Sequence, residues 1–195
     1  MTLLTLIRHG QTDWNLDRRI QGSTDIPLNE TGRADARTAA AALAGTTHHA
    51  IYTSPLLRAR ETAEIISAEL GLGTPILVPG IREREFGDGE GMSVSEYMEA
   101  YGGWHSEVPG AESLDDVAAR SLQALDTIAR DSRRRSTPVA ESVVVVAHGG
   151  VIRSLIDHVS GGTLPRPGDQ ILNGSAHRFE ASPGVLRLLD QSVLI

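Results

Sequence analysis

The chain has 195 residues, 40% of them hydrophobic and 22% charged, and its formal net charge is −7. This length and composition predict one globular domain, and the acidic balance argues against a nucleic-acid partner. Cysteine is absent and all 18 Lys+Arg positions are arginine, which excludes disulfides, a thiolate nucleophile and lysine-based catalysis.

No apolar run approaches the roughly 20 residues that a membrane-spanning helix needs, so no membrane partner is expected. The short apolar run at the start lacks a preceding basic segment, so we expect no signal peptide and predict a cytoplasmic location. The sequence leaves the oligomeric state open, with a homodimer as one option.

An apolar run of strand length, residues 3–7, ends abruptly in Arg8 and His9. Such a run, bounded by a glycine, predicts a buried strand. Ligands bind at the carboxyl ends of strands in open α/β sheets, so Arg8 and His9 are candidates for a binding site. The polar stretch 17–28 predicts a loop. Residues 29–43, capped by an asparagine, predict a helix.

The next fifty residues predict a strand, a helix and a second strand. Residues 50–53 form a short strand pattern, and Ser54 followed by proline predicts the start of a helix. Arg58 falls in the first turn of that helix, again near the carboxyl end of a strand. Residues 75–78 predict another short strand.

A loop and a long helix are predicted after these elements. Residues 81–91 contain three glycines in five positions, which predicts a loop that can approach a ligand. With the short helix after it, this stretch predicts a lid-like insertion at about residues 86–112. Ser113 is suited to cap a helix that runs to Arg130. The basic run at residues 133–135 predicts a solvated loop.

The valine-rich stretch 142–147 is the most strand-like segment of the chain, and it runs directly into His148. The two glycines that follow begin a predicted helix. Residues 175–180 and 185–190 flank a Pro-Gly turn and predict an antiparallel hairpin.

Strands and helices alternate along most of the chain before this hairpin. The pattern predicts an α/β protein, a three-layer α/β/α sandwich with a mostly parallel central sheet, in a single domain of residues 1–195. Parallel neighbours bring their carboxyl ends to one edge of a sheet. We therefore expect the imidazoles of His9 and His148 to lie side by side.

Two histidines, two arginines and at least one carboxylate are thus expected at the strand ends. A neutral imidazole can attack phosphorus and form a covalent intermediate. The guanidinium groups of Arg8 and Arg58 match phosphate oxygens and disfavour an imidazolium at His9. A carboxylic acid can give the leaving alkoxide its proton. The residues therefore predict a phosphomonoester site.

The ordered set of motifs resembles the histidine phosphatase superfamily, in its phosphoglycerate-mutase-like branch. The similarity spans nearly the whole chain, and Arg-His-Gly alone is a weak motif, whereas the ordered set is specific. The resembling blocks are 6–15, 21–22, 27–28, 31–32, 54–63, 82–87, 109–113 and 146–150.

The resemblance implies that His9 is the phosphorylated nucleophile and that Glu83 is the general acid, then the base for the attacking water. It implies no metal and no other cofactor, and a small phosphorylated metabolite as substrate. The residues that it implies for binding the phosphoryl group or lining the pocket are Arg8, Thr12, Asn15, Gln21, Gly22, Arg58, His148 and Gly149.

Several assignments have rivals or plainer interpretations. Taken alone, Arg58 fits an ordinary arginine on a helix surface. Glu83 has three rivals in its own loop: Glu85, Asp88 and Glu90. His48 and His49 are expected to be solvated rather than to form a metal pair. The other histidines, which lack partners in the sequence, are expected to be structural: His105, His158 and His177. Four side chains fit either the core or a specificity pocket: Trp14, Tyr97, Met98 and Trp104.

The same chemistry serves a phosphatase and a 2,3-bisphosphoglycerate-dependent phosphoglycerate mutase. Mutases of this family carry basic residues after the catalytic glutamate, whereas no arginine lies between Glu85 and Ala119 here. Net hydrolysis of a phosphomonoester is therefore predicted. Arg18 and Arg19 could supply charge at the rim, which keeps the mutase as an alternative. A non-catalytic module that binds phosphorylated ligands is the alternative from another class.

Overall fold

The computed structural model describes residues 1–136, 141–166 and 168–189 of the chain. Within these residues, one sheet has the strand order β3-β2-β4-β1-β5-β6, in which β3, β2, β4 and β1 are parallel. The last two strands form an antiparallel hairpin that pairs with β1. The strands are β1 (Thr2–Arg8), β2 (Ala50–Thr53), β3 (Ile76–Leu77), β4 (Glu141–Ala147), β5 (Ala176–Ser182) and β6 (Val185–Leu188).

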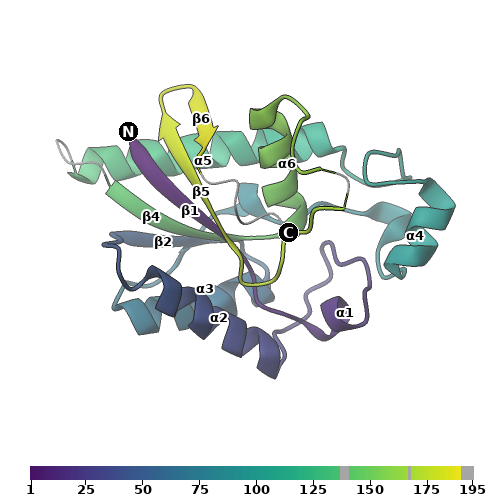
Figure 1. Ribbon diagram of the computed structural model, residues 1–195, viewed down its shortest axis with the longest axis horizontal. Helices are drawn as coiled ribbons and strands as arrows, with labels where there is room; N and C mark the ends of the chain where they lie inside the picture. The colour runs from purple at the N-terminus through teal and green to yellow at the C-terminus, as the bar shows by residue number, and fades with distance from the viewer. Residues whose placement is uncertain (137–140, 167, 190–195) are drawn as a thin grey trace.

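Helices cover both faces of this sheet (Figure 1). One apolar cluster joins the sheet to α2 (Glu30–Leu43) and α3 (Leu57–Leu70), and another joins its opposite face to α5 (Leu114–Ser136) and α6 (Gly149–Ser160). The predicted three-layer α/β/α arrangement with a mostly parallel sheet is therefore confirmed.

Strand β4 shows why the sheet needs cover on both faces. All seven of its residues are buried, because it lies between β1 and β2 inside the sheet. Its side chains alternate between the layers: Val143 and Val145 pack in the cluster with α5 and α6, and Val144 and Val146 in the cluster with α2 and α3. Continuous valine is the sequence pattern of such a strand, since neither face meets water.

Two of the expected helix caps are present. The side chain of Asn29 accepts a hydrogen bond from the Gly32 amide at 2.9 Å, and the Ser113 hydroxyl accepts one from the Asp116 amide at 3.0 Å. The predicted start of α3 at Ser54 is wrong, because the helix begins at Leu57. The Ser54 hydroxyl is instead bonded to His148, at the centre of the molecule.

The predicted loop at residues 133–135 is also wrong. These arginines continue α5, which runs to Ser136 instead of Arg130. Arginine is a good helix former, so a basic run is no reason for a helix to end. Strand β3 is shorter than expected, at two residues. Asp190, the expected last residue of the hairpin, lies outside the described residues.

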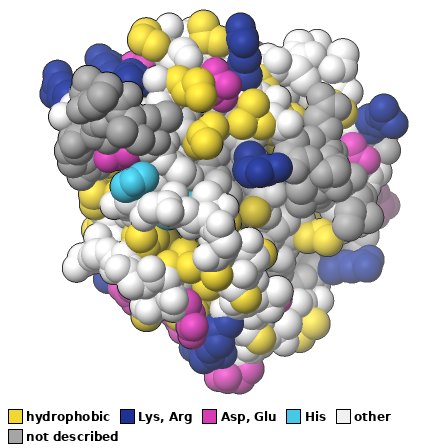
Figure 2. Space-filling view, turned by 60° about the vertical axis from the view of Figure 1, so that its left-hand side comes forward, with side chains coloured by type: hydrophobic (Ala, Val, Ile, Leu, Met, Phe, Trp, Pro, Cys, Tyr) yellow, Lys and Arg dark blue, Asp and Glu magenta, His cyan; other side chains and the backbone are white. Residues whose placement is uncertain are grey.

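The segment between β3 and α5 lies beyond the end of the sheet and carries η1 (Pro79–Ile81), η2 (Gly87–Gly89) and α4 (Val94–Tyr101). Together with Ile20, it has an apolar cluster of its own, centred on Phe86 and Tyr97. The short helix α1 (Asp13–Leu16) lies at the same end of the molecule (Figure 1). Figure 2 brings the other end forward, and there basic, acidic and hydrophobic side chains are interspersed among the described residues.

Candidate active site

Two histidines meet where the parallel strands end. Strands β1 and β4 are neighbours, with Arg8 opposite Ala147, so the residues that follow them lie side by side. The ring centroids of His9 and His148 are 5.1 Å apart, and both rings are buried. The juxtaposition expected from the sequence is therefore present. We call His9, His148, Arg8, Arg58 and Glu83 the histidine cluster.

The contacts of the His9 ring distinguish its two nitrogens. Nδ1 lies 2.8 Å from the Gly10 carbonyl oxygen, which can only accept, so Nδ1 carries a proton. Nε2 is then free to accept, and it receives a hydrogen bond from Nε of Arg58 at 3.3 Å. The nitrogen with the lone pair therefore faces a guanidinium group, where an anion would be attracted.

Burial and positive charge hold His9 in its neutral form. Burial lowers the pKa of His9 well below its usual value, and the charges of Arg58 and Arg8 lower it further. The pKa of His148 is also well lowered, by burial first and then by Arg58 and His9. Both imidazoles are therefore unprotonated at neutral pH, as a nitrogen nucleophile requires.

The two arginines are anchored from different sides. Arg58 is fully buried and donates to the carbonyl oxygens of Gly22 at 2.8 Å and Thr24 at 3.0 Å. Burial lowers the pKa of Arg58 to about 10, against the opposing charge of Glu83. Arg8 donates to the Ile171 carbonyl, while its Nε is buried without a partner among the described residues.

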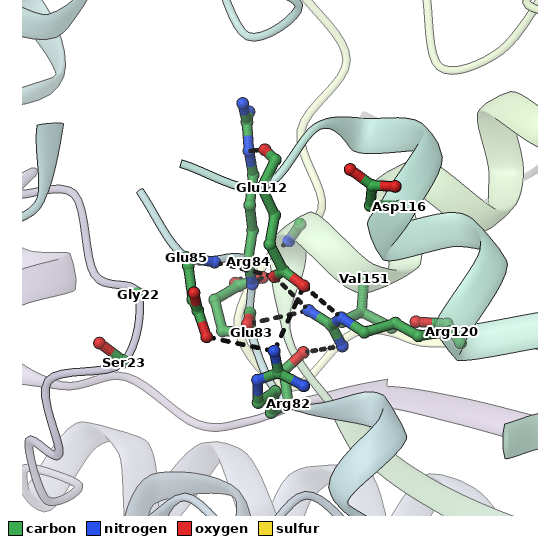
Figure 3. Close-up of polar contacts among 12 residues, drawn as sticks. Gly22, Ser23, Arg82, Glu83, Arg84, Glu85, Glu112, Asp116, Arg120 and Val151 are labelled. Carbon is green, nitrogen blue, oxygen red and sulfur yellow. Dashed lines mark hydrogen bonds and ion pairs between the residues drawn. The ribbon is translucent and has the colours of Figure 1, made fainter. Parts of the chain in front are cut away.

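Glu83 overhangs the cluster from the segment after β3. Its two carboxylate oxygens accept from the Arg84 amide at 2.8 Å and from the Gly150 amide at 3.1 Å. The second donor belongs to the first turn of α6. A Cβ at Gly150 would lie 2.4 Å from Oε1 of Glu83, so only glycine admits the carboxylate there. Figure 3 shows Glu83 next to its chain neighbour Arg84.

A cleft of about 840 Å³ opens from the cluster, and Arg8, His9 and Glu83 line its inner end. Its outer part is lined by segments from three regions of the chain, and we call this part the outer cleft. The outer-cleft residues that matter below are Arg18, Arg19, Met98, Trp104, Arg153 and Arg166. A buried reactive centre at the base of a wider cleft is the usual form of an enzyme site for a small molecule.

A family model described as histidine phosphatase superfamily (branch 1) matches residues 4–192. The chain belongs to the histidine phosphatase superfamily. A phosphohistidine intermediate is typical of its members, and the protein is an enzyme of this phosphatase family.

Phosphatases of this superfamily resemble the chain along almost its whole length. An uncharacterized phosphatase, PhoE of Bacillus subtilis, is 35% identical over 99% of this chain and 95% of its own. A metal-independent phosphoserine phosphatase of Arabidopsis thaliana is 34% identical over 100% and 80%. The mycobacterial glucosyl-3-phosphoglycerate phosphatase Rv2419c, solved with VO3, has a TM-score of 0.82 at 29% identity over 96% and 97%. Relatives named 2,3-bisphosphoglycerate-dependent phosphoglycerate mutases also match, at 32% to 35% identity.

Four of the eight binding residues expected from the sequence line the cleft, Arg8 among them. Asn15, Gln21 and Gly149 line the cleft. The buried Gln21 side chain accepts from the Thr12 hydroxyl at 3.0 Å, and its own amide nitrogen has no partner within the described part of the chain. Thr12 therefore orients Gln21 from behind. Gly22 also lies behind the cleft, where its carbonyl oxygen holds Arg58.

The structure separates Glu83 from its rivals. Glu85 and Asp88 are exposed, and Glu90 accepts hydrogen bonds from the backbone amides of Gly22, Ser23 and Thr24. Among these four carboxylates, only Glu83 lines the cleft.

The other residues of uncertain role divide between core, cleft and surface. Tyr97 is core, whereas Met98 and Trp104 line the cleft. Trp14 is half-buried at the rim, under the guanidinium of Arg19 at 4.9 Å.

The remaining histidines have varied surroundings. His105 lines the cleft and is exposed, which differs from the structural role expected for it. His177 is buried beside Ser175, as a structural residue would be. His158 is exposed in the last turn of α6, which also differs from the structural role expected for it. His48 is half-buried against Ser142, and His49 is exposed.

Two polar residues of the site, Ser54 and Asn173, were not expected there from the sequence. Ser54 contacts Nε2 of His148 at 2.7 Å, and Asn173 donates to the His9 carbonyl oxygen at 2.9 Å and to Oδ1 of Asn15 at 3.1 Å. Asn173 is 164 residues from His9 in the chain, so no local pattern could reveal the contact. The two residues come together because β5, which follows Asn173 in the chain, pairs with β1, which precedes His9.

Two features are absent from the described residues. No group of three or more histidine, aspartate or glutamate side chains is placed to hold a metal ion. No helix within this part of the chain combines the length and apolar character needed to cross a membrane.

Proposed function

We propose that the protein hydrolyses a small phosphomonoester through a phosphohistidine at His9. The observation that carries the proposal is the His9 ring, which presents an unprotonated Nε2 to Arg58 beside the neutral His148. A nucleophilic nitrogen in a cationic, buried position is suited to attack a phosphoryl group that arginines hold.

In the first step, Nε2 of His9 bonds to phosphorus as the bond from phosphorus to the ester oxygen breaks. The electron pair of that bond goes to the leaving oxygen, which takes the carboxyl proton of Glu83. Arg8 and Arg58 bind the phosphoryl oxygens. They neutralise the charge on these oxygens while the phosphoryl group transfers in line from the ester oxygen to Nε2. The alcohol leaves, and a phosphohistidine and a Glu83 carboxylate remain.

In the second step, the Glu83 carboxylate takes a proton from water as the water oxygen bonds to phosphorus. The bond between phosphorus and Nε2 breaks, and its electron pair returns to the imidazole. Inorganic phosphate leaves, and Glu83 again carries the proton with which the cycle began. The same carboxyl group thus acts first as an acid and then as a base.

Turnover of p-nitrophenyl phosphate in excess EDTA tests the reaction, and rapid quenching with a ³²P-labelled phosphomonoester tests the intermediate. We expect undiminished turnover in EDTA and an acid-labile, base-stable phosphoryl group on His9. Loss of activity on chelation, or a quenched enzyme that never carries label during turnover, would overturn the proposal. Tight binding of phosphorylated ligands without turnover would instead support the non-catalytic module.

The phosphoglycerate mutase remains a second candidate because the outer cleft is cationic. Among the described residues that line the cleft, arginines stand at positions 8, 18, 19, 84, 153 and 166, against the carboxylates of Glu83, Asp157 and Asp169. The insertion at residues 86–112 supplies none of these arginines, which favours hydrolysis. Isomerisation of 3-phosphoglycerate that needs 2,3-bisphosphoglycerate and outruns its hydrolysis would reverse this preference.

The arginines also support a substrate with a polar or acidic group besides its phosphate. Two relatives carry the names of such substrates, phosphoserine and glucosyl-3-phosphoglycerate. A panel of these two, 3-phosphoglycerate and neutral sugar phosphates tests the point, since acidic substrates should have the higher kcat/KM. Equal or better turnover of the neutral sugar phosphates would contradict it. A cytoplasmic location and a homodimer stay predictions of the sequence.

A further inference from the structure

Glu83 stands on a segment that has no regular structure to hold it. The chain leaves η1 at Ile81 and forms no helix or strand before η2 begins at Gly87. A general acid has to stay within hydrogen-bond reach of the leaving oxygen, and a displacement of about 1 Å can cost on the order of 100-fold in rate. Contacts from elsewhere in the fold must therefore hold this segment in place.

Arg120 of α5 supplies such contacts. Its guanidinium donates through one terminal nitrogen to the carbonyl oxygens of Gly80 at 2.9 Å and Arg82 at 2.8 Å, and through the other to the carbonyl oxygen of Glu83 itself at 3.0 Å. Figure 3 shows Arg120 reaching toward Arg82 and Glu83 from α5. One side chain thus anchors three peptide groups within four residues.

Glu112 binds both Arg120 and the segment that carries Glu83. Its carboxylate accepts from Nε and a terminal nitrogen of Arg120, each at 2.8 Å, and also from the amide of Glu85 at 3.1 Å. Burial raises the pKa of Glu112, but the hydrogen bonds from Arg120 and the Glu85 amide outweigh it, so the carboxylate stays charged. The pair is bidentate and mostly shielded from water, with side-chain exposures of 16% and 15%. Such pairs are geometrically specific.

Neither member of this pair is among the described residues that line the cleft. The pair also lies next to Arg84, whose guanidinium donates to the carbonyl oxygens of Glu112 and Trp104, each at 2.7 Å. The Glu83 carboxylate is therefore held by two amides, while the backbone that carries it is held by Arg120.

We propose that Arg120 and Glu112 are positioning residues that hold Glu83 where it protonates the leaving group. The inference rests on the proposed function, because it assigns Glu83 the role of acid. It predicts a particular kind of defect when the pair is broken. Protonation matters little for a leaving group that is stable as an anion and greatly for one that is basic.

A series of substituted phenyl phosphates tests the proposal, from p-nitrophenyl phosphate to phenyl phosphate, at nearly constant substrate size. The parameter is kcat/KM, which reports the steps up to formation of the phosphohistidine. Glu83→Gln should lose at least about tenfold more activity on phenyl phosphate than on p-nitrophenyl phosphate. Arg120→Met and Glu112→Gln should show the same trend with a smaller loss.

Two further measurements separate positioning from general stability. Arg130→Met removes an arginine that forms an ion pair with Asp126 on the same helix, and it should leave the whole series unchanged. In the Glu83→Gln background, Arg120→Met should add no further dependence on the leaving group. Glu112→Gln keeps the shape and an acceptor, so it serves where Arg120→Met lowers the Tm too far to be assayed.

The outcomes distinguish this inference from the proposed function. A steeper dependence on the leaving group in both Arg120→Met and Glu112→Gln supports the positioning pair. A loss that is equal across the series, or no loss, in variants that fold, overturns the pair while Glu83→Gln still shows the dependence. A flat response in Glu83→Gln itself overturns the acid role of Glu83 and the inference with it.

Discussion

The histidine cluster and the outer cleft adjoin each other but are built in opposite ways. His9, Arg58 and His148 are buried to within 2% of full burial, and the Arg58 guanidinium bonds to backbone carbonyls and to His9. Arg18, Arg19 and Arg166 of the outer cleft are exposed. Burial makes each charge in the cluster costly to move or replace, whereas an exposed arginine can be exchanged at little cost in stability.

This difference indicates a division of work. The cluster is suited to one reaction on a phosphoryl group, because hydrogen bonds within the fold fix Arg58 and the proposed nucleophile, His9, before a substrate arrives. If the cluster binds the phosphoryl group as proposed, the rest of the substrate lies in the outer cleft, because the cleft opens in that direction. We therefore expect substitutions in the cluster to change the rate for every substrate, and substitutions in the outer cleft to change which substrate is preferred.

The largest effect should come from His9→Ala, which removes the only atom proposed to bond to phosphorus. Turnover of p-nitrophenyl phosphate and of every ester in a substrate panel should fall at least about 10³-fold, and no phosphoenzyme should form. His158→Ala, at an exposed histidine, is the matched control and should be unaffected. Residual turnover within tenfold of the parent would remove His9 from the mechanism.

Replacing Arg58 with alanine should have the next largest effect. The variant loses a buried guanidinium that faces Nε2 of His9, and kcat/KM should fall about 10²- to 10³-fold on all substrates alike. Arg60→Ala changes an exposed arginine on the same helix and should leave the kinetics unchanged. A loss confined to some substrates would contradict the division between cluster and outer cleft.

A smaller and selective effect is expected for Arg153→Ala in the outer cleft. The half-buried Arg153 donates to the Asp169 carbonyl and lines the cleft. Kinetics with p-nitrophenyl phosphate should stay within about threefold, while the preference for acidic over neutral phosphate esters should fall about tenfold. A uniform loss across the panel would place Arg153 functionally with the cluster.

The smallest predicted effect is on how the free energy of unfolding depends on pH. The pKa values of His9 and His148 are lowered in the folded chain, whereas in the unfolded chain they lie near the usual value of about 6.5. Below about pH 6.5 the unfolded state therefore binds more protons than the folded state. The free energy of unfolding should therefore fall with pH below 6.5, by up to about 1.4 kcal/mol per pH unit for each histidine, and these two should contribute nothing above it.

Urea denaturation between pH 5.5 and 7.5 measures this slope. His9→Gln should make it shallower, because one of the two histidines is gone, whereas His158→Gln should leave it unchanged. An identical slope in His9→Gln and the parent would mean that the buried ring does not titrate as expected.

The elements that carry the cluster were predictable because their signals are local. A valine run buried on both faces identifies β4, and the pairing of His9 with His148 follows from parallel neighbours. The wrong predictions came from local sequence patterns that fit more than one structure. Ser54 precedes a proline as a helix cap would, but its hydroxyl is bonded to His148. The charge of the basic run at residues 133–135 suggests a solvated loop, but arginine is a good helix former and the run continues α5.

The contacts that hold the cluster could not be predicted in this way. Asn173 reaches His9 across 164 residues, and Arg120 reaches the carbonyl oxygen of Glu83 across 37. Each depends on how layers pack, which hydrophobic periodicity does not specify. Glu83 itself was chosen from a motif, since nothing in its loop distinguishes it from Glu85 before burial is known.

The position of β1 between β4 and β5 has a consequence for biosynthesis. Strand β1, which leads into His9, is made before the other strands of this sheet, but both of its neighbours come from residues 141–182. At usual rates of protein synthesis, His148 leaves the ribosome on the order of ten seconds after His9. A nascent chain therefore carries His9 for that time without the ring of His148 beside it, and the histidine cluster can form only after β4 has been made.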